Sequence, residues 1–462
     1  MAPLRVIIVG GGLAGTLLAN ALQRHGIDFT IYERDERGSK REGYQIRLGA
    51  AALVGFRACL EQAQIDELMK KFGRSGGLIS SAPILYDTSF NCLIDLTRFP
   101  AYTKSAPINR VVLRDFLAQP IDDAGNLQYK KRFVKYDIVQ REGKSKVVAH
   151  FDDGTTDEGD LLISAEGSGS KVNGQIGLAN IVQLHDKWGF LAKASLPPLR
   201  LLALAPEVRK APVSCIKNGV ILFFSAYMPD ASNATRHDET TEDGTTKIED
   251  YDINSASVFW GLTVPAELVP KEGGSAIANK LDFCLDIIKS WDPKYHDMLK
   301  VIDDESDIYT FQARASTEPT TNWREKQKRN GGNGIDQVWL MGDAIHPMLP
   351  SRGMGANQAM HDAADILPAI LDLNERSKSQ KILSDGNFAA AVKQYESKMM
   401  PRAFGWVKTS GGTGSQTFEP ESLKGKIALF FVARALDVTW IYSSIRRWSG
   451  WVPQDDAPEL PN

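Results

Sequence analysis

The feature that most constrains this chain is a glycine-rich turn near its N-terminus. Gly10, Gly12 and Gly15 follow an apolar run at residues 4–9, typical of a strand buried on both faces, and precede a helical pattern at residues 13–25. In this setting the G-x-G-x-x-G spacing permits a tight turn, close approach to a pyrophosphate and close packing of helix on strand. We therefore predict a dinucleotide site formed by Gly10, Gly12, Leu13, Ala14 and Gly15.

An acidic residue stands where such a site needs one. Residues 27–33 form a second strand pattern, which completes a β-α-β unit, and Glu33 ends it. A carboxylate at this point accepts hydrogen bonds from an adenosine ribose, and Arg34 next to it is a further candidate contact. An acid suits a free ribose hydroxyl, so the pattern predicts NAD or FAD rather than NADP here. The alternative is a plain tight turn in an α/β protein.

Composition sets wider limits. A chain of 462 residues has material for two or three domains, and a net charge of −3 does not favour a nucleic acid as partner. The four cysteines are scattered without metal-like spacing, so we expect reduced thiols and no metal site. The N-terminus lacks the pattern of a signal peptide, and we expect a cytoplasmic protein.

One C-terminal segment raises a membrane question. Residues 427–445 are strongly apolar, but Arg434 and Asp437 stand near the middle, where charges are costly in a bilayer. We predict a packed C-terminal helix and no integral membrane span, with peripheral membrane contact as the alternative.

A second motif separates FAD from NAD. The stretch LMGDAIHPMLPSRGMGANQAMHDAAD, residues 340–365, puts Gly-Asp at the end of a strand pattern, before a glycine-rich loop and a helix that starts near residue 355. A plain NAD dehydrogenase has no need for this second carboxylate. A flavoprotein needs a contact near the ribityl chain and the flavin ring, so the motif favours FAD.

This stretch strongly resembles the third motif of the single-component FAD-dependent aromatic hydroxylases, the para-hydroxybenzoate hydroxylase-like monooxygenases. The matching residues are Gly342, Asp343, Ala344, His346, Pro350, Gly353, Gly355, Asn357, Ala359, Asp362 and Ala363. The resemblance implies that Asp343 contacts the ribityl–phosphate region of FAD. It also implies that the loop Gly353, Gly355, Ala356 and Asn357 offers backbone N–H groups to the flavin pyrimidine edge, with His346 structural.

Other segments extend the resemblance over most of the chain. Residues 160–172 are similar to the middle motif of the family, except that Glu166 replaces an aspartate and Asn173 stands where an arginine is usual. Arg110 matches an arginine that reaches the FAD phosphate and ribityl region, with Arg114 as a weaker candidate. Arg47, in GYQIRLG at residues 43–49, lies on the strand that runs beside the flavin.

The resemblance implies a reaction. NADH or NADPH reduces FAD, O₂ gives a C4a-hydroperoxyflavin, and an aromatic or alkene substrate takes one oxygen atom. Hydroxylation, dearomatisation and epoxidation, including that of an indole, share this intermediate. The tail at residues 395–407 looks most like fungal secondary-metabolism members. The alternatives are a flavoprotein oxidase or dehydrogenase on the same fold, and a non-catalytic nucleotide-binding protein.

For substrate chemistry the resemblance suggests the carbonyl of Pro350, which faces the substrate in the family, and Arg47. Tyr227 is a further candidate, because its hydroxyl could orient a substrate oxygen. Phe223, Phe224 and Trp260 stand on the same strand patterns, either as cavity walls or as core.

The predicted fold class is α/β: a Rossmann-like FAD-binding domain with an inserted, mostly antiparallel β-sheet substrate domain and a C-terminal helical segment. The FAD-binding domain takes residues 1–77, 106–175 and 316–375, the sheet domain 78–105 and 176–315, and the helical region 376–462. We expect a monomer or homodimer.

Overall fold

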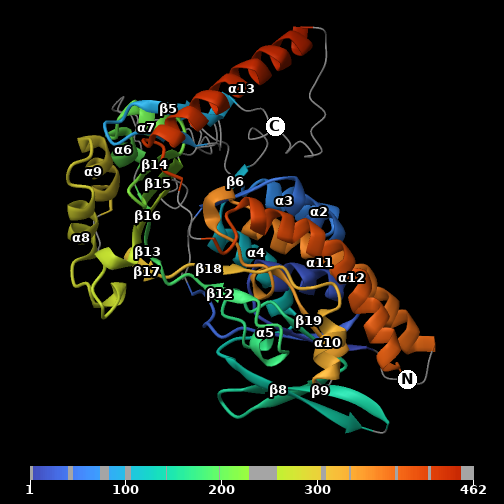
Figure 1. Cartoon of the computed structure of the whole chain (residues 1–462). Helices are drawn as coiled ribbons and strands as arrows, with labels where there is room; N and C mark the ends of the chain where they lie inside the picture. The colour runs from blue at the N-terminus through green and yellow to red at the C-terminus, as the bar shows by residue number, and fades with distance from the viewer. Residues whose placement is uncertain are drawn as a thin grey trace, which may run out of the picture.

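The computed structural model describes residues 4–39, 45–72, 83–98, 106–141, 143–196, 198–227, 257–302, 308–331, 335–379, 383–414 and 418–448. Its two large sheets lie in different parts of the molecule (Figure 1), and the buried apolar residues form one cluster around each sheet. This arrangement of a parallel and a mostly antiparallel sheet confirms the predicted α/β fold class. The exact domain boundaries stay a prediction.

The first sheet has five parallel strands in the order β19-β11-β1-β2-β7. Its strands are β1 (Arg5–Val9), β2 (Asp28–Tyr32), β7 (Leu127–Gln128), β11 (Leu161–Ser164) and β19 (Val338–Leu340). Every residue of β11 and β19 is buried, which requires cover on both faces of the sheet. The predicted β-α-β unit is therefore present, and β1 lies at the point where the strand order reverses.

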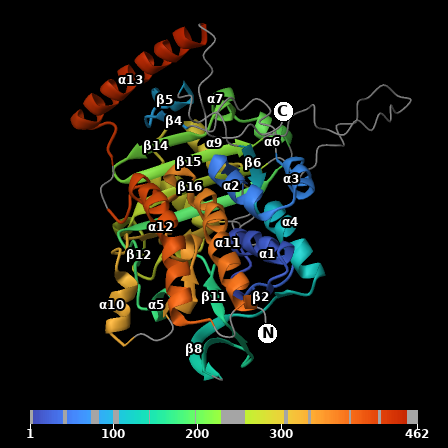
Figure 2. The same ribbon diagram turned by 90° about the vertical axis from the view of Figure 1, so that its right-hand side faces the viewer.

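Helices cover one face of this sheet and a small sheet covers the other (Figure 2). The helices are α1 (Leu13–Arg24), α2 (Ala50–Cys59), α3 (Gln62–Met69), α4 (Arg110–Asp123), α11 (Gly355–Ser379) and α12 (Asp385–Thr409). The small antiparallel sheet contains β8 (Phe133–Arg141), β9 (Lys144–Phe151) and β10 (Thr156–Gly159). Short helices α5 (Lys171–Gln175) and α10 (Trp323–Arg329) complete this part.

The second large sheet has seven strands in the order β17-β13-β16-β15-β14-β4-β5, antiparallel except between β14 and β4. Its strands are β4 (Ile84–Tyr86), β5 (Cys92–Asp95), β13 (Lys187–Ser195), β14 (Val213–Lys217), β15 (Val220–Tyr227), β16 (Ser257–Pro265) and β17 (Ile308–Phe311). Helices α6 (Pro198–Leu202), α7 (Pro206–Lys210), α8 (Lys280–Ile287) and α9 (Pro293–Lys300) contribute to its buried cluster.

Two short strand pairs lie between the large sheets. Strand β3 (Gln45–Leu48) pairs with β6 (Ala106–Asn109), and β12 (Ile181–Gln183) pairs with β18 (Arg314–Ser316). Strand β3 also contacts β16 of the seven-stranded sheet and α11 of the first part. It therefore brings the face of one sheet close to the helices of the other.

The last described helix corrects a prediction. Helix α13 (Leu423–Trp448) extends away from the body in both views (Figures 1 and 2), and none of its apolar window is buried. The prediction of a packed C-terminal helix is wrong for the described residues, because this window is not buried. Among the described residues, α13 is the one helix that is both long enough and apolar enough to cross a membrane.

Candidate functional site

The glycine turn after β1 has the geometry that its sequence predicts. Gly10 has φ +111°, and a Cβ placed there would lie 2.3 Å from the carbonyl oxygen of Ala165. A Cβ on Gly15 would lie 2.1 Å from the carbonyl oxygen of Gly10, so helix and turn touch. A Cβ on Gly12 would meet nothing within 4 Å. The turn is thus tight on two sides and open at the start of α1, where no described side chain caps the helix.

Glu33 holds this turn from the end of β2. Its Oε2 accepts a hydrogen bond from the Gly11 N–H at 2.7 Å, and its Oε1 accepts one from the Asp35 N–H at 2.8 Å. The side chain is half-buried at the sheet edge, and each carboxylate oxygen keeps a further lone pair that can accept another hydrogen bond. Arg34 is exposed and lies 3.8 Å from the Asp35 carboxylate.

The Gly-Asp motif converges on the same edge of the parallel sheet. It follows β19, and the carboxyl ends of parallel strands share one edge. Gly342 has φ +58°, and a Cβ on it would lie 3.7 Å from the Cβ of Ala14 in α1. A Cβ on Gly355, where α11 starts, would lie 3.9 Å from Asp343 Oδ1. An exposed Asp343, between buried Gly342 and Ala344, thus stands close to the first turns of two helices.

A buried charge network fixes the turn that carries Asp343. Asp362 Oδ2 accepts a hydrogen bond from the Gly342 N–H at 2.7 Å and lies 2.7 Å from His346 Nε2. Its Oδ1 accepts a hydrogen bond from Arg402 of α12 at 2.6 Å. Burial alone would raise the pKa of Asp362, but His346 and Arg402 outweigh it and leave that pKa lowered. His346 is fully buried in this network, which supports its structural role.

Two asparagines form hydrogen bonds to the other side of the turn that carries Asp343. Asn173 Nδ2 donates to the carbonyl oxygen of Ala344 at 2.9 Å and to Asn180 Oδ1 at 2.8 Å. Asn180 Nδ2 donates to the carbonyl oxygen of Ile345 at 2.9 Å. Asn173 therefore has a defined task in the position where the family pattern has an arginine. Neither role was predicted, and only the buried amide groups reveal them.

The glycine loop before α11 is joined to β3 through one side chain. Asn357 Nδ2 donates to the carbonyl oxygens of Arg47 at 2.9 Å and Gly353 at 3.1 Å. Its Oδ1 accepts a hydrogen bond from the Gly49 N–H at 2.8 Å. The loop, with Gly353 at φ +62°, and the strand that carries Arg47 are thus held together. The Asn357 side chain is used internally, so the backbone of this loop remains the part able to meet a ligand.

Arg110 lies at the same end of the fold as the glycine turn. Asn20 and Gln23 of α1 donate to the carbonyl oxygens of Leu117 and Pro120 of α4, with the same sequence offset of 97 in both contacts. A constant offset means that the helices run in the same direction. Their first residues, Leu13 and Arg110, therefore stand at one end. Arg114 instead donates to the carbonyl oxygen of Ser39 at 2.6 Å and pairs with Asp115.

Glu166 turns toward the protein rather than the candidate ligand space. Its Oε2 accepts hydrogen bonds from Ser164 Oγ at 3.0 Å, Ser170 Oγ at 2.7 Å and the Val172 N–H at 3.2 Å. The extra methylene relative to aspartate allows this reach to the start of α5. The carboxylate thereby stabilises the loop after β11, which contacts Gly10.

The seven-stranded sheet presents alternate side chains to two different environments. Phe224 and Trp260 are fully buried against the helices α6–α9, so they are core residues. Phe223 and Phe259 point to the opposite, half-exposed face, with ring centroids 6.0 Å apart. Of the predicted aromatic walls, Phe223 alone is shown on this face. Tyr227 ends β15, but its side chain lies outside the described residues.

Pro350 begins a 3-10 turn, Pro350–Arg352, directly before Gly353, and it is exposed. The next residue, Ser351, donates from Oγ to the carbonyl oxygen of Ser410 at 2.9 Å, which ties the turn to the end of α12. The structure therefore places Pro350 on the loop of Gly353 and Gly355, next to the other motif residues.

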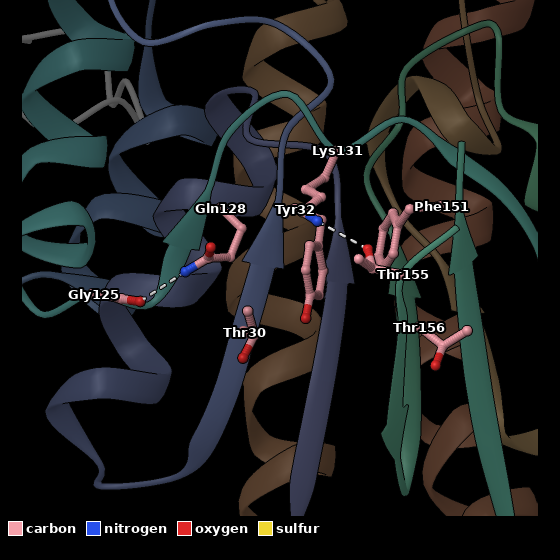
Figure 3. Close-up of a pocket in the computed structure, with 8 residues that line it drawn as sticks. All are labelled: Thr30, Tyr32, Gly125, Gln128, Lys131, Phe151, Thr155 and Thr156. Atoms are coloured by element: carbon pink, nitrogen blue, oxygen red, sulfur yellow. Dashed lines mark hydrogen bonds between the residues drawn. The ribbon is translucent and has the colours of Figure 1, made fainter. Parts of the chain in front are cut away.

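A cavity of about 270 Å³ lies elsewhere, beside β2, β7 and the small sheet (Figure 3). It is lined by Thr30, Tyr32, Gly125, Gln128, Lys131, Phe151, Thr155 and Thr156. None of the predicted site residues lines it, and the Tyr32 hydroxyl is used on Asp157 at 2.8 Å. We do not assign the site to this cavity. Among the described residues no group of three His, Cys, Asp or Glu side chains could hold a metal ion.

The residues at the junction fit FAD on their own geometry. The open Gly12 leaves space for a pyrophosphate at a helix start, and Asp343 supplies an exposed acceptor where a second helix begins. A model of the FAD binding domain family matches residues 3–192 and 290–385, more than half of the chain. This match includes the glycine turn and the Gly-Asp motif.

The relatives carry related names. The chain is 24% identical over 457 residues to a dual O-methyltransferase/FAD-dependent monooxygenase of Phaeosphaeria nodorum, covering 90% of this chain and 47% of that protein. It is 25% identical over 411 residues to a chloroplastic zeaxanthin epoxidase of Oryza sativa subsp. japonica, with 86% and 53% covered. The chain therefore spans about half the length of these two relatives.

A third relative is matched over most of its length. An FAD-dependent monooxygenase of Talaromyces islandicus is 27% identical over 410 residues, covering 86% of this chain and 89% of that protein. Among solved structures, Klebsiella pneumoniae HpxO complexed with FAD and uric acid has a TM-score of 0.63 at 17% identity, with 95% and 96% covered. That likeness supports the fold.

Proposed function

Because the chain belongs to the FAD binding domain family, we propose that it is an FAD-dependent monooxygenase. It uses NADH or NADPH and O₂ to insert one oxygen atom into an aromatic or unsaturated small molecule. The names of the fungal and plant relatives, which include monooxygenases and an epoxidase, support this class of reaction. We place the protein in the cytoplasm and in secondary metabolism on the resemblance to fungal members.

The observation that carries the proposal is the position of Asp343. An exposed carboxylate at the carboxyl edge of a parallel sheet stands beside the starts of α1 and α11, more than three hundred residues after Gly10. A nucleotide alone would be held by the first turn. The second carboxylate and the second helix start are needed by a ligand that continues past the pyrophosphate.

The roles of the chain's own residues follow. The backbone of Gly12, Leu13 and Ala14 holds the pyrophosphate, and Glu33 accepts hydrogen bonds from the adenosine ribose. Asp343 accepts hydrogen bonds from the ribityl hydroxyls, with Arg110 beside the phosphates. Backbone N–H groups from Gly353 to Asn357 face the flavin ring, where they favour negative charge.

Bound FAD supplies the redox chemistry, since the flavin accepts hydride from the nicotinamide and activates O₂. The chain's part is to position the substrate and exclude water. We propose that the half-exposed face of β15 and β16, with Phe223 and Phe259, forms the apolar wall over the ring. Arg47 and the carbonyl of Pro350 border the same space from β3 and the glycine loop.

The test is the visible spectrum of the purified protein, before and after NADPH or NADH is added without oxygen. A yellow protein that bleaches, and that consumes NAD(P)H faster with a substrate and O₂, supports the proposal. In some flavoproteins NAD(P)H reduces the flavin only after the substrate has bound, so candidate aromatics and alkenes are added in a second run. A protein reduced by a substrate but never by NAD(P)H would be an oxidase or dehydrogenase. A protein that takes up no FAD would contradict the proposal altogether.

A further inference from the structure

Helix α13 has a surface unlike the rest of the molecule. It contains 26 residues, Leu423–Trp448, and its apolar window has no buried residue. Its large exposed apolar side chains are Leu423, Ile427, Phe430, Phe431, Val432, Val438, Trp440, Ile441, Tyr442, Ile445 and Trp448. Phe431 and Val438 are each 66% exposed and Trp448 is 97% exposed. Water alone does not stabilise so large an apolar surface.

The apolar residues of α13 do not form a single stripe. At about 100° per residue, Ile427, Phe431 and Val438 fall on one side of the helix, whereas Val432 and Trp440 fall on others. A second copy of the chain, in a coiled coil, would cover one seam only and leave the other sides in water. A helix that is apolar all round needs an apolar environment all round.

The dimensions of α13 match those of a bilayer. Residues 427–445 rise about 28 Å at about 1.5 Å per residue, close to the hydrocarbon thickness of about 30 Å. Lys424 and Lys426 precede this stretch and Arg446 follows it. Cationic side chains at both ends complement lipid phosphates, and Trp440, Tyr442 and Trp448 are of the types that favour the membrane interface.

The charges within the stretch are paired. Arg434 and Asp437 form an ion pair at 2.9 Å, one helical turn apart, and the Arg434 guanidinium lies over the Phe430 ring at 5.8 Å. A lone charge there would be costly in lipid, whereas a pair carries no net charge and a long arginine can reach toward the interface. The pair therefore lowers the penalty that the sequence alone suggests.

The base of α13 is fixed to the seven-stranded sheet. Glu419 accepts hydrogen bonds from the Asn218 N–H at 3.0 Å and the Gly219 N–H at 2.7 Å, in the turn between β14 and β15. Glu421 pairs with Lys217 of the same hairpin, and this bond lowers the pKa of Glu421. The helix thus projects from a defined point on the sheet rather than from a loose tail.

We propose that α13 inserts into a lipid bilayer and holds the protein at a membrane surface. Its apolar sides enter the hydrocarbon region, its terminal lysines and arginine meet lipid phosphates, and the β14–β15 hairpin keeps the seven-stranded sheet next to the bilayer. The inference does not depend on the proposed oxygenation reaction.

The experiment is flotation of the purified full chain with vesicles of phosphatidylcholine, alone or mixed with phosphatidylserine. The double variant Phe431→Glu, Val438→Glu puts charges on the exposed apolar surface of α13. Val134→Glu, on an exposed position of β8, is the matched control. We expect the wild-type protein and the control to float with both vesicles, and the double variant to lose at least about tenfold in bound fraction. Unchanged thermal unfolding by circular dichroism shows that the variants are folded.

Three outcomes would overturn the proposal. The wild-type protein could remain at the bottom of the gradient with both vesicle types. The double variant could float as well as the wild type, or only with anionic vesicles, which would assign binding to surface charge elsewhere. The wild-type protein could be a dimer without vesicle binding, with the double variant a monomer, which would make α13 an interface between copies.

Discussion

The five-stranded and the seven-stranded sheets place their chemistry in different ways. In the parallel sheet every residue of β11 and β19 is buried, so no side chain on these two strands can meet a ligand. The candidate residues stand at the strand ends, in turns with fixed backbone geometry. In the antiparallel sheet, β16 alternates buried and half-buried residues, and the candidate residues stand on the face.

This difference decides what each region contributes. Turns such as Gly10–Gly15 depend on close backbone contacts, so they hold a cofactor that must always fit in the same way. The face of β15 and β16 depends only on side chains that point away from the core. Its residues can change without disturbing the fold, which suits the part of the site that selects a substrate.

The largest loss of stability is expected in the buried charge network behind the turn of Asp343. Asp362→Ala removes the acceptor of Gly342 and the carboxylate partner of His346, and it leaves Arg402 with Asp365 as its remaining carboxylate. Loss of one member of a buried charge pair costs about 3–5 kcal/mol. Thermal and urea unfolding measure this loss. Asp372→Ala, which breaks an exposed pair with Arg376, should change stability little, and equal effects of both variants would contradict the network's role.

Two substitutions on paired strands test the two faces of the antiparallel sheet. Trp260→Ala on the core face should destabilise the protein by about 3–5 kcal/mol. Phe223→Ala on the half-exposed face should cost less than half as much, but should alter substrate-stimulated NAD(P)H consumption at normal FAD content. Urea unfolding and steady-state rates distinguish them. If Phe223→Ala leaves every rate unchanged for the best substrate found, this face does not line the substrate space.

Glu33→Ala tests the nucleotide end of the parallel sheet's site. The variant loses both the ribose acceptor and the bonds to Gly11 and Asp35. We expect the FAD dissociation constant to rise about tenfold, because a charged acceptor is lost. Fluorescence titration of the apoprotein measures it, with Glu36→Ala, an exposed acid in the next turn, as control. Unchanged binding would mean that the ribose is held elsewhere.

The smallest effect concerns pH. The carboxylate of Asp362 raises the pKa of His346 although burial opposes this. The ion pair therefore contributes fully to folding stability below the usual value of 6.5, and this contribution is lost as the pH rises through the raised pKa. The lowered pKa of Asp362 means that its contribution is present above the usual value of 3.8 and lost as the pH falls through the lowered pKa. The melting-temperature advantage of wild type over His346→Gln should therefore be largest between these values. If the melting-temperature difference between the two proteins stayed constant up to alkaline pH, His346 would stabilise the fold by packing alone and not by its charge.

The two regions also differ in what the sequence reveals. Apolar runs and glycine spacing predicted the β1–α1 turn, the start of α11 at residue 355 and the edge position of Asp343, because local backbone geometry dictates those residues. The same patterns cannot show which face of β15 or β16 is covered by helices, so Phe223 and Phe224 looked alike. The Arg402–Asp362 pair joins helices 40 positions apart and leaves no local signal. For α13, composition was correctly read as apolar, but the predicted packing was wrong because the contact with β5 leaves its apolar window unburied.

The most direct test of the account is FAD binding to the wild-type apoprotein, Asp343→Ala and Asp372→Ala, followed by flavin fluorescence. Asp343 and Asp372 are both exposed aspartates, but only Asp343 stands at the junction of the two helix starts. We predict that Asp343→Ala raises the FAD dissociation constant by about ten- to a hundredfold, with unfolding unchanged, and that Asp372→Ala binds as wild type. Full flavin occupancy and wild-type affinity in Asp343→Ala would contradict the assignment of the site to this edge of the sheet.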